Sequence, residues 1–209
     1  MGFNIAIIDY EMGNLKSIYK CLKYLDIQTI ITDSKETILN ANGIILPGVG
    51  AFGIAIETLI EKKLDLIIKQ VVAQNIPLFG ICLGLQLLFS KSEEMGEYEG
   101  LNLIPGNVNL FEKKFVNKIP HIGWNNVSFT NNYHFILEGI PNNSYFYFVH
   151  SYFAVPKDKR TVLGTTKYGD TEFASIIGDK NIIATQFHPE KSGKTGISLL
   201  KNFIKYCKE

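Results

Sequence analysis

The sequence contains little of what several specialised classes of protein require. Its 209 residues include three cysteines, one tryptophan and four histidines, and 21 Lys+Arg nearly balance 20 Asp+Glu. Cys21, Cys82 and Cys207 are too widely separated for a disulfide framework or for the ligand spacing of a metal site. There is no run of basic residues and no segment of RNA-binding type. We therefore expect no bound metal and no nucleic-acid partner.

Long hydrophobic runs are also missing. No apolar run approaches the roughly 18 residues that span a bilayer, so we expect no contact with a membrane. The first apolar stretch is short and meets Asp9 and Glu11 too early for a signal peptide. These features predict a cytoplasmic protein. The length predicts a single domain over residues 1–209.

The first ninety residues alternate between strand and helix patterns. Apolar or β-branched runs predict strands over 4–9, 27–31, 43–46 and 77–80. Helical spacing of apolar residues follows the first run over 15–25, and a long amphipathic helix is predicted through residues 60–71. Such alternation is typical of a mostly parallel sheet covered by helices on both faces.

The second half of the chain has a different pattern. From residue 107 onward, short strand candidates are separated by turn-forming clusters, and a final helix carries an apolar stripe through residues 196–207. The predicted strands are 108–111, 126–129, 145–153, 161–166, 171–177 and 181–187. We therefore predict an α/β fold, with a mostly parallel central sheet and an antiparallel extension.

Residues 77–87, PLFGICLGLQL, carry the strongest chemical signal. A short strand pattern leads into Gly-Ile-Cys-Leu-Gly at residues 80–84, and a helical pattern follows. This is the strand–nucleophile–helix order of a nucleophile elbow, with Cys82 in place of serine. Glycines on both sides permit a sharp turn. The pentapeptide alone favours a catalytic cysteine over a buried structural one, and a catalytic cysteine also needs a base from elsewhere in the chain.

His188 and Glu190 can supply that base and its partner. His188 ends the apolar segment before Pro189, and a proline disfavours helical backbone at the residue before it. In extended backbone, His188 and Glu190 project to the same side. Glu190 can then accept from one imidazole nitrogen while the other faces Cys82. A nucleophile, a base and an orienting carboxylate together predict a catalytic triad.

With these motifs the chain resembles the class I (triad) glutamine amidotransferases, whose fold is flavodoxin-like. The resemblance rests on residues 80–84, on His188-Pro189-Glu190, and on the glycine-rich segment 47–50 (PGVG), and it covers nearly the whole chain. It implies a triad of Cys82, His188 and Glu190 and no cofactor. The oxyanion would be bound by the backbone N–H of Leu83 and by the segment containing Val49 and Gly50, and the resemblance also implies four substrate-binding residues: Gln86, Glu94, Ser151 and Tyr152.

Further segments resemble one branch of that family, the glutaminase subunit of imidazole glycerol phosphate synthase in histidine biosynthesis. They are residues 8–10 (IDY), 13–15 (GNL), 47–52 (PGVGAF), 120–125 (PHIGWN), 149–152 (VHSY) and 186–192 (QFHPEKS). Glu11 departs from the pattern, because the branch commonly has glycine there.

This resemblance implies that glutamine is hydrolysed to glutamate and ammonia, and that the ammonia passes to a cyclase subunit with a (β/α)8 barrel. It implies a heterodimer whose docking face includes Asn14, Trp124, Tyr147 and Lys191, with Trp124 in a short loop. His121 lies three residues before Trp124, and its position in the sequence is compatible with a structural role.

Three alternatives remain open at this stage. One is a glutaminase subunit of another synthase, such as a pyridoxal-phosphate system. Another is a free-standing cysteine hydrolase of the γ-glutamyl hydrolase or peptidase type. The third is a flavodoxin-like binding module in which the three triad residues are incidental.

Overall fold

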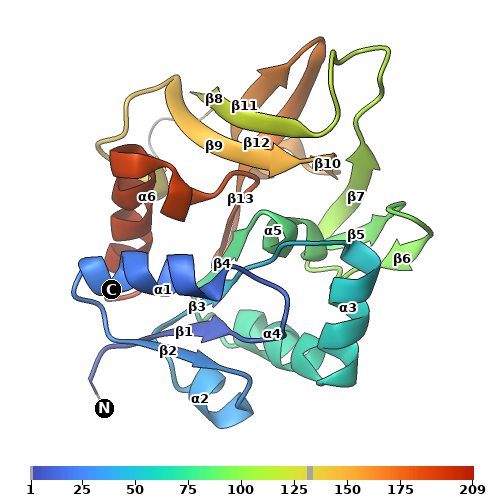
Figure 1. Cartoon of the computed structure of the whole chain (residues 1–209). Helices are drawn as coiled ribbons and strands as arrows, with labels where there is room; N and C mark the ends of the chain where they lie inside the picture. Colours follow the sequence, from blue (N-terminus) through green and yellow to red (C-terminus); the bar gives the residue numbers. More distant parts are fainter. Residues whose placement is uncertain (1, 131–133) are drawn as a thin grey trace.

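A computed structural model describes residues 2–130 and 134–209. The described residues form a nine-stranded sheet and a smaller four-stranded sheet, with helices packed on the larger one (Figure 1). The nine-stranded sheet has the order β2-β1-β3-β4-β13-β12-β11-β8-β9, and the smaller one has the order β10-β7-β5-β6. None of the described helices is long and apolar enough to span a membrane.

The parallel half of the large sheet comes from the first ninety residues and one late strand. Neighbouring strands run parallel from β2 through β1, β3 and β4 to β13. Their bounds are β1 (Ile5–Ile8), β2 (Thr29–Thr32), β3 (Gly43–Leu46), β4 (Leu78–Ile81) and β13 (Ile182–Thr185). Four of the five are buried along their whole length, as expected for strands covered on both faces.

Helices cover both faces of this parallel half, because successive residues in each strand point to opposite sides. In β1, Ile5 and Ile7 pack in the same apolar cluster as α1 and α6, whereas Ala6 and Ile8 pack with α2 to α5. The helices are α1 (Leu15–Tyr24), α2 (Lys35–Leu39), α3 (Phe52–Glu61), α4 (Leu64–Ala73), α5 (Leu83–Leu87) and α6 (Gly193–Tyr206).

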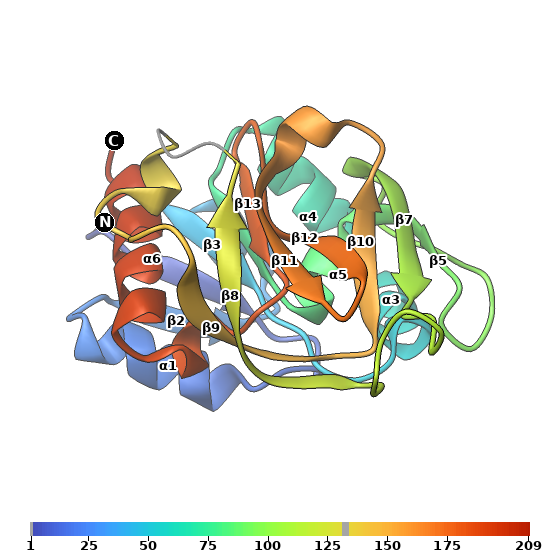
Figure 2. The same cartoon turned by 90° about the horizontal axis from the view of Figure 1, so that it is seen from above.

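The rest of the large sheet is antiparallel. It consists of β8 (His121–Phe129), β9 (Ser144–His150), β11 (Val162–Tyr168) and β12 (Thr171–Asp179). The smaller sheet consists of β5 (Phe89–Ser92), β6 (Tyr98–Glu99), β7 (Ile104–Leu110) and β10 (Tyr152–Pro156). In the view from above, β10 and β7 lie on the opposite side of β11 and β12 from α6 (Figure 2). Three single-turn 3₁₀ helices complete the described elements: Phe135–Leu137, Lys159–Thr161 and Pro189–Lys191.

Three predictions about elements are wrong. The helix predicted through residues 60–71 is two helices, because the chain breaks after α3 and Lys63 adopts a left-handed φ of 58° before α4. The strand predicted over 145–153 is also two elements: β9 ends at His150, and β10 begins at Tyr152 in the other sheet. Trp124 lies inside β8 and not in a loop.

Candidate active site

Three loops meet at the carboxyl edge of the parallel strands. β4 lies between β3 and β13, and all three run in the same direction. Cys82 follows β4 directly, the segment 47–50 follows β3, and His188 follows β13 after two residues. Ligand sites in open α/β sheets form at this edge. The topology therefore brings together segments that are far apart in the sequence.

The nucleophile elbow has the geometry that its glycines predict. Cys82 has φ 54° and ψ −108° and is the N-cap of α5, where its carbonyl accepts the backbone N–H groups of Leu85 and Gln86. Its own N–H is bonded to Thr185 O on β13 at 2.8 Å. A Cβ on Gly84 would lie 2.0 Å from Leu46 O, so only glycine lets the elbow approach β3 this closely.

Two of the three residues predicted to form a triad, His188 and Glu190, are in direct contact, and the backbone at Glu190 differs from the prediction. Nδ1 of His188 lies 2.8 Å from Glu190 Oε1, and both side chains are almost fully buried. Glu190 belongs to the 3₁₀ turn Pro189–Lys191 and not to an extended segment, but the turn keeps its carboxylate beside the imidazole. The other ring nitrogen, Nε2, is buried and makes no hydrogen bond to any described residue.

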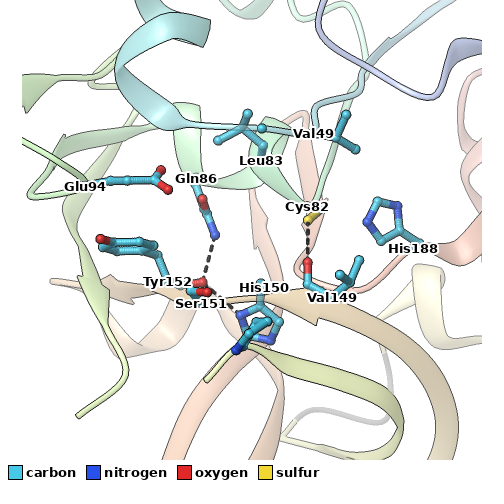
Figure 3. A pocket seen from close by; sticks show the side chains of 12 residues that line it. Val49, Cys82, Leu83, Gln86, Glu94, Val149, His150, Ser151, Tyr152 and His188 are labelled. Carbon is cyan, nitrogen blue, oxygen red and sulfur yellow. Dashed lines mark hydrogen bonds between the residues drawn. The ribbon is translucent and has the colours of Figure 1, made fainter. Parts of the chain in front are cut away.

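The charged groups around His188 favour a protonated imidazole. Burial of His188 opposes a positive charge, but the neighbouring Cys82 and Glu190 outweigh the burial and raise the pKa of His188 to about 10. Cys82 Sγ lies 3.8 Å from Val149 O and 3.7 Å from Nε2 of Gln186. Figure 3 shows the Cys82 sulfur between Gln86 on one side and His188 on the other.

A cavity of about 360 Å³ opens over the elbow. Its lining includes all of the predicted oxyanion and substrate-binding residues, together with two members of the predicted triad, Cys82 and His188. The full lining is Val49, Gly50, Cys82, Leu83, Gln86, Glu94, Pro120, Val149, His150, Ser151, Tyr152 and His188. Ser151 is the single residue between β9 and β10, so the cavity wall lies where the chain passes from one sheet to the other.

The segment 47–50 packs tightly on the elbow. The Tyr10 hydroxyl donates to Pro47 O at 2.7 Å in the buried interior. A Cβ on Gly48 would lie 2.6 Å from that hydroxyl and 2.8 Å from the Cβ of Leu83. Gly50 has φ 103°, a conformation that favours glycine. Tyr10 thus holds the upstream end of the segment predicted to supply an oxyanion donor.

Glu94 lines the cavity from the other side. Its Oε2 accepts the Phe52 N–H at 2.7 Å, at the start of α3. Burial raises the pKa of Glu94, and the Phe52 hydrogen bond opposes this. In Figure 3 the carboxylate points toward the cavity that Gln86 and Cys82 also line.

The four residues predicted at a docking face do not all lie on one element. Trp124 on β8 pairs with Tyr147 on β9, their rings 6.2 Å apart, and Lys191 Nζ lies 6.0 Å from the Tyr147 ring. Trp124 is 55% exposed. Asn14 is the N-cap residue of α1, and α1 contacts the turn that contains Lys191. Tyr147 O also accepts the His188 N–H at 3.0 Å, so this surface adjoins the triad.

The structure also adds site residues that the sequence did not single out: Tyr10, His150 and Gln186. Gln186 could have been predicted from the sequence, because it precedes His188 by two residues and side chains two apart in extended backbone point to the same side of the strand. Glu11, where glycine is common in the resembled branch, has a φ of 68° and an ion pair with Lys62 at 2.9 Å.

Comparison with known proteins shows the family to which the chain belongs. Residues 6–207 match the family described as glutamine amidotransferase class-I. This chain belongs to the class-I glutamine amidotransferases. The predicted fold class is thereby confirmed: the PurLQS structure from Thermotoga maritima superposes on this amidotransferase with a TM-score of 0.77, at 18% identity and over 99% of each chain. A glutamine amidotransferase from Thermotoga maritima has a TM-score of 0.62, at 18% identity and over 100% of this chain and 83% of that one.

Sequence relatives place this amidotransferase in the branch that the motifs indicated. Imidazole glycerol phosphate synthase subunit HisH from Methanocaldococcus jannaschii is 50% identical over 96% of this chain and 98% of its own. Subunit HisH 1 from Methanococcus maripaludis is 48% identical over 96% of this chain and 98% of its own. The protein from Chlorobaculum tepidum is 41% identical over 97% of this chain and all of its own. The chain is therefore a HisH-type amidotransferase.

Proposed function

We propose that this chain is the glutaminase subunit of imidazole glycerol phosphate synthase and hydrolyses glutamine to glutamate and ammonia. The observation that carries the proposal is the position of Cys82 at the end of β4, beside the His188–Glu190 pair at the end of β13. The cavity above them has room for a small amino acid. The relatives' names supply the pathway, histidine biosynthesis.

In the first half-reaction, the Cys82 sulfur attacks the side-chain amide carbon of glutamine. The C–S bond forms as the amide π electrons move to oxygen, and His188 carries the thiol proton. The tetrahedral intermediate then collapses: the C–N bond breaks, and His188 delivers the proton to the departing nitrogen. Ammonia leaves, and a γ-glutamyl thioester remains on Cys82.

In the second half-reaction, His188 removes a proton from water, which attacks the thioester carbon. The C–S bond breaks, glutamate leaves and the proton returns to the sulfur. Glu190 keeps the imidazole oriented through both steps, because its Oε1 is bound to Nδ1 at 2.8 Å.

Two backbone donors would stabilise the oxyanion of each tetrahedral intermediate. One is the Leu83 N–H, directly after the nucleophile. The other comes from Val49 or Gly50 in the segment that Tyr10 holds at its upstream end. Removal of one such donor typically costs about 3 kcal/mol of barrier, so the orientation of this segment controls the rate.

The remaining cavity residues would bind the substrate. Nε2 of Gln86 gives hydrogen bonds to Tyr152 O at 2.8 Å and to Gln186 Oε1 at 3.1 Å, which leaves Oε1 of Gln86 to accept from the substrate. Glu94 offers a carboxylate to the substrate ammonium. Ser151 and Tyr152 offer backbone groups to the substrate carboxylate.

We further propose that the chain works as one domain in a heterodimer with the cyclase subunit. The face formed by Trp124, Tyr147, Lys191 and Asn14 would dock on the cyclase. An exposed tryptophan is the type of residue that dominates interface energies. Tyr147 connects this face to the backbone of His188. Docking would keep the ammonia in a shielded path until the cyclase uses it.

A glutaminase assay with and without the cyclase and its nucleotide ligand tests the proposal. We expect low activity alone, a strong rise in the complex, and loss of ammonia release in Cys82→Ser with retained binding to the cyclase. Full activity without the cyclase would contradict the docking scheme. Faster turnover of γ-glutamyl peptides than of glutamine would favour a free-standing hydrolase instead.

A further inference from the structure

Two buried histidines outside the triad face each other at the wall of the cavity. His121 on β8 and His150 on β9 are directly opposed in the strand register and are 3% and 7% exposed. Nδ1 of His121 lies 2.9 Å from Nε2 of His150. Only one hydrogen can lie between these two nitrogens, so the contact requires one nitrogen to donate and the other to accept.

The surroundings of the pair are aromatic. Phe111, Phe148 and Phe173 lie against both imidazoles, and Tyr168 stacks on His121 at 4.1 Å. This burial lowers the pKa of His121 to about 4 and that of His150 to about 3. Both rings are therefore neutral at pH 7, with one hydrogen each.

The hydrogen bonds at one end fix the tautomer of His121. Nδ2 of Asn125 donates to Lys167 O at 3.1 Å, and a carbonyl oxygen can only accept, so this atom is the amide nitrogen. The same nitrogen lies 3.3 Å from Nε2 of His121, which must accept. The hydrogen of His121 is then on Nδ1 and points at His150.

The other end leads independently to the same assignment. Nδ1 of His150 lies 2.8 Å from Tyr152 O, so it carries the ring hydrogen and donates. Nε2 of His150 is left to accept, which is what the Nδ1 hydrogen of His121 requires. The carbonyl oxygens of Lys167 and Tyr152 thus specify the same arrangement, with the hydrogen of each ring on Nδ1.

The arrangement continues to the nucleophile. Tyr152 O accepts from Gln86 as well as from His150, and the second hydrogen of the Gln86 amide goes to Oε1 of Gln186. Nε2 of Gln186 is then directed at Cys82 Sγ, 3.7 Å away. Figure 3 shows the Gln86 nitrogen turned toward Tyr152 and the adjoining His150 beneath it.

We propose that His121 and His150 are positioning residues for glutamine hydrolysis, acting as a neutral pair with the hydrogen of each ring on Nδ1. His150 donates to the Tyr152 carbonyl oxygen, and this oxygen also accepts from the Gln86 amide nitrogen, which leaves the Gln86 amide oxygen toward the substrate. Gln86 also donates to the Gln186 amide oxygen, so the Gln186 amide nitrogen faces the Cys82 sulfur. The expected effect on glutamine hydrolysis rests on the proposed function, whereas the hydrogen positions on His121 and His150 do not depend on it.

Variants of His121 test the kinetic consequence in the complex with the cyclase. His121→Phe keeps an aromatic ring but removes the donor, whereas His121→Asn keeps an NH group near the position of Nδ1. His121→Gln is the matched control, because its amide group reaches the position of Nε2 instead. Loss of one neutral hydrogen bond corresponds to about a 2- to 12-fold change in binding.

In His121→Phe and His121→Gln we expect the KM for glutamine to rise about 2- to 12-fold, with a smaller change in kcat. In His121→Asn we expect a KM near that of the wild type. A merely structural role would lower the amount of folded enzyme without this split or this rescue. Unchanged KM in folded His121→Phe, or no rescue by His121→Asn, would overturn the proposal.

Nitrogen NMR of the ¹⁵N-histidine-labelled wild-type chain at pH 7, without glutamine, tests the geometry alone. We expect both rings to be neutral with the hydrogen on Nδ1. A charged ring, or a hydrogen on Nε2 of either one, would refute the pair whatever the activity. Absence of glutamine hydrolysis in the wild-type complex would refute the proposed function and leave the NMR result standing.

Discussion

Acid should destabilise this protein through the buried His121–His150 pair. An unfolded histidine has a pKa near 6.5, whereas burial holds the pKa of folded His121 at about 4. Below pH 6.5, therefore, His121 binds a proton in the unfolded chain but stays neutral in the folded chain, so the free energy of unfolding falls as the pH falls. At pH 5.5 the difference is about 0.9 proton, which corresponds to about 1.2 kcal/mol per pH unit for His121 alone.

The perturbation that isolates this effect is His121→Phe, with His121→Asn beside it. Urea unfolding of wild type and variants at several values between pH 5.0 and 6.5 gives the slope of unfolding free energy against pH. We expect both variants to lose at least about 1 kcal/mol per pH unit of slope, although only His121→Phe has a raised KM. The comparison uses slopes, so a constant loss of stability in a variant does not disturb it.

Equal slopes in wild type and both variants would refute the reasoning, because they would mean that folded His121 takes up a proton as readily as the unfolded chain. His188 does not obscure the window. Its pKa is raised to about 10, so the stability that it contributes is fully present below pH 6.5 and is lost only as the pH rises toward 10.

Three further changes test other contacts of the site. Glu190→Gln should lower the pKa of the His188 imidazole and, as for other orienting carboxylates of catalytic triads, reduce kcat by at least about 100-fold; a pH–rate profile together with imidazole NMR measures both, and an unchanged profile would contradict the proposed role. Tyr10→Phe leaves Pro47 O without its buried donor and should lower the unfolding free energy by about 1–3 kcal/mol. It should also lower kcat while KM changes less. The control is Ser175→Ala, which removes a buried hydroxyl bonded to Thr166 and should leave kcat unchanged. Gly84→Ala places a methyl group 2.0 Å from a backbone oxygen and should destabilise the fold by about 1–3 kcal/mol, visible in urea unfolding; wild-type stability would show that the elbow can move.

The parallel half of the fold was predictable because short-range sequence patterns specify it. Buried parallel strands are apolar runs in the sequence, and their carboxyl ends meet at one edge, so Cys82 and His188 could be brought together without a structure. The break at Lys63 was not predictable in this way, because apolar spacing continues across it and no proline or glycine marks it.

The second half was harder because tertiary pairing overrides local pattern. Residues 145–153 are uniformly strand-like, yet Ser151 separates two strands that join different sheets. His121 and His150 lie 29 positions apart and gave no shared signal. Only the antiparallel register of β8 and β9, fixed by the whole sheet, makes them neighbours.

The left-handed backbone at Cys82 carries an evolutionary implication. A non-glycine residue in such a conformation typically costs of order 1–3 kcal/mol, which the surrounding packing has to supply. Glycine would relieve that cost, so Cys82→Gly should give a more stable but inactive protein. Selection for thermal robustness alone would therefore push this position away from cysteine. Cysteine at this strained position therefore gives up stability in exchange for a nucleophile.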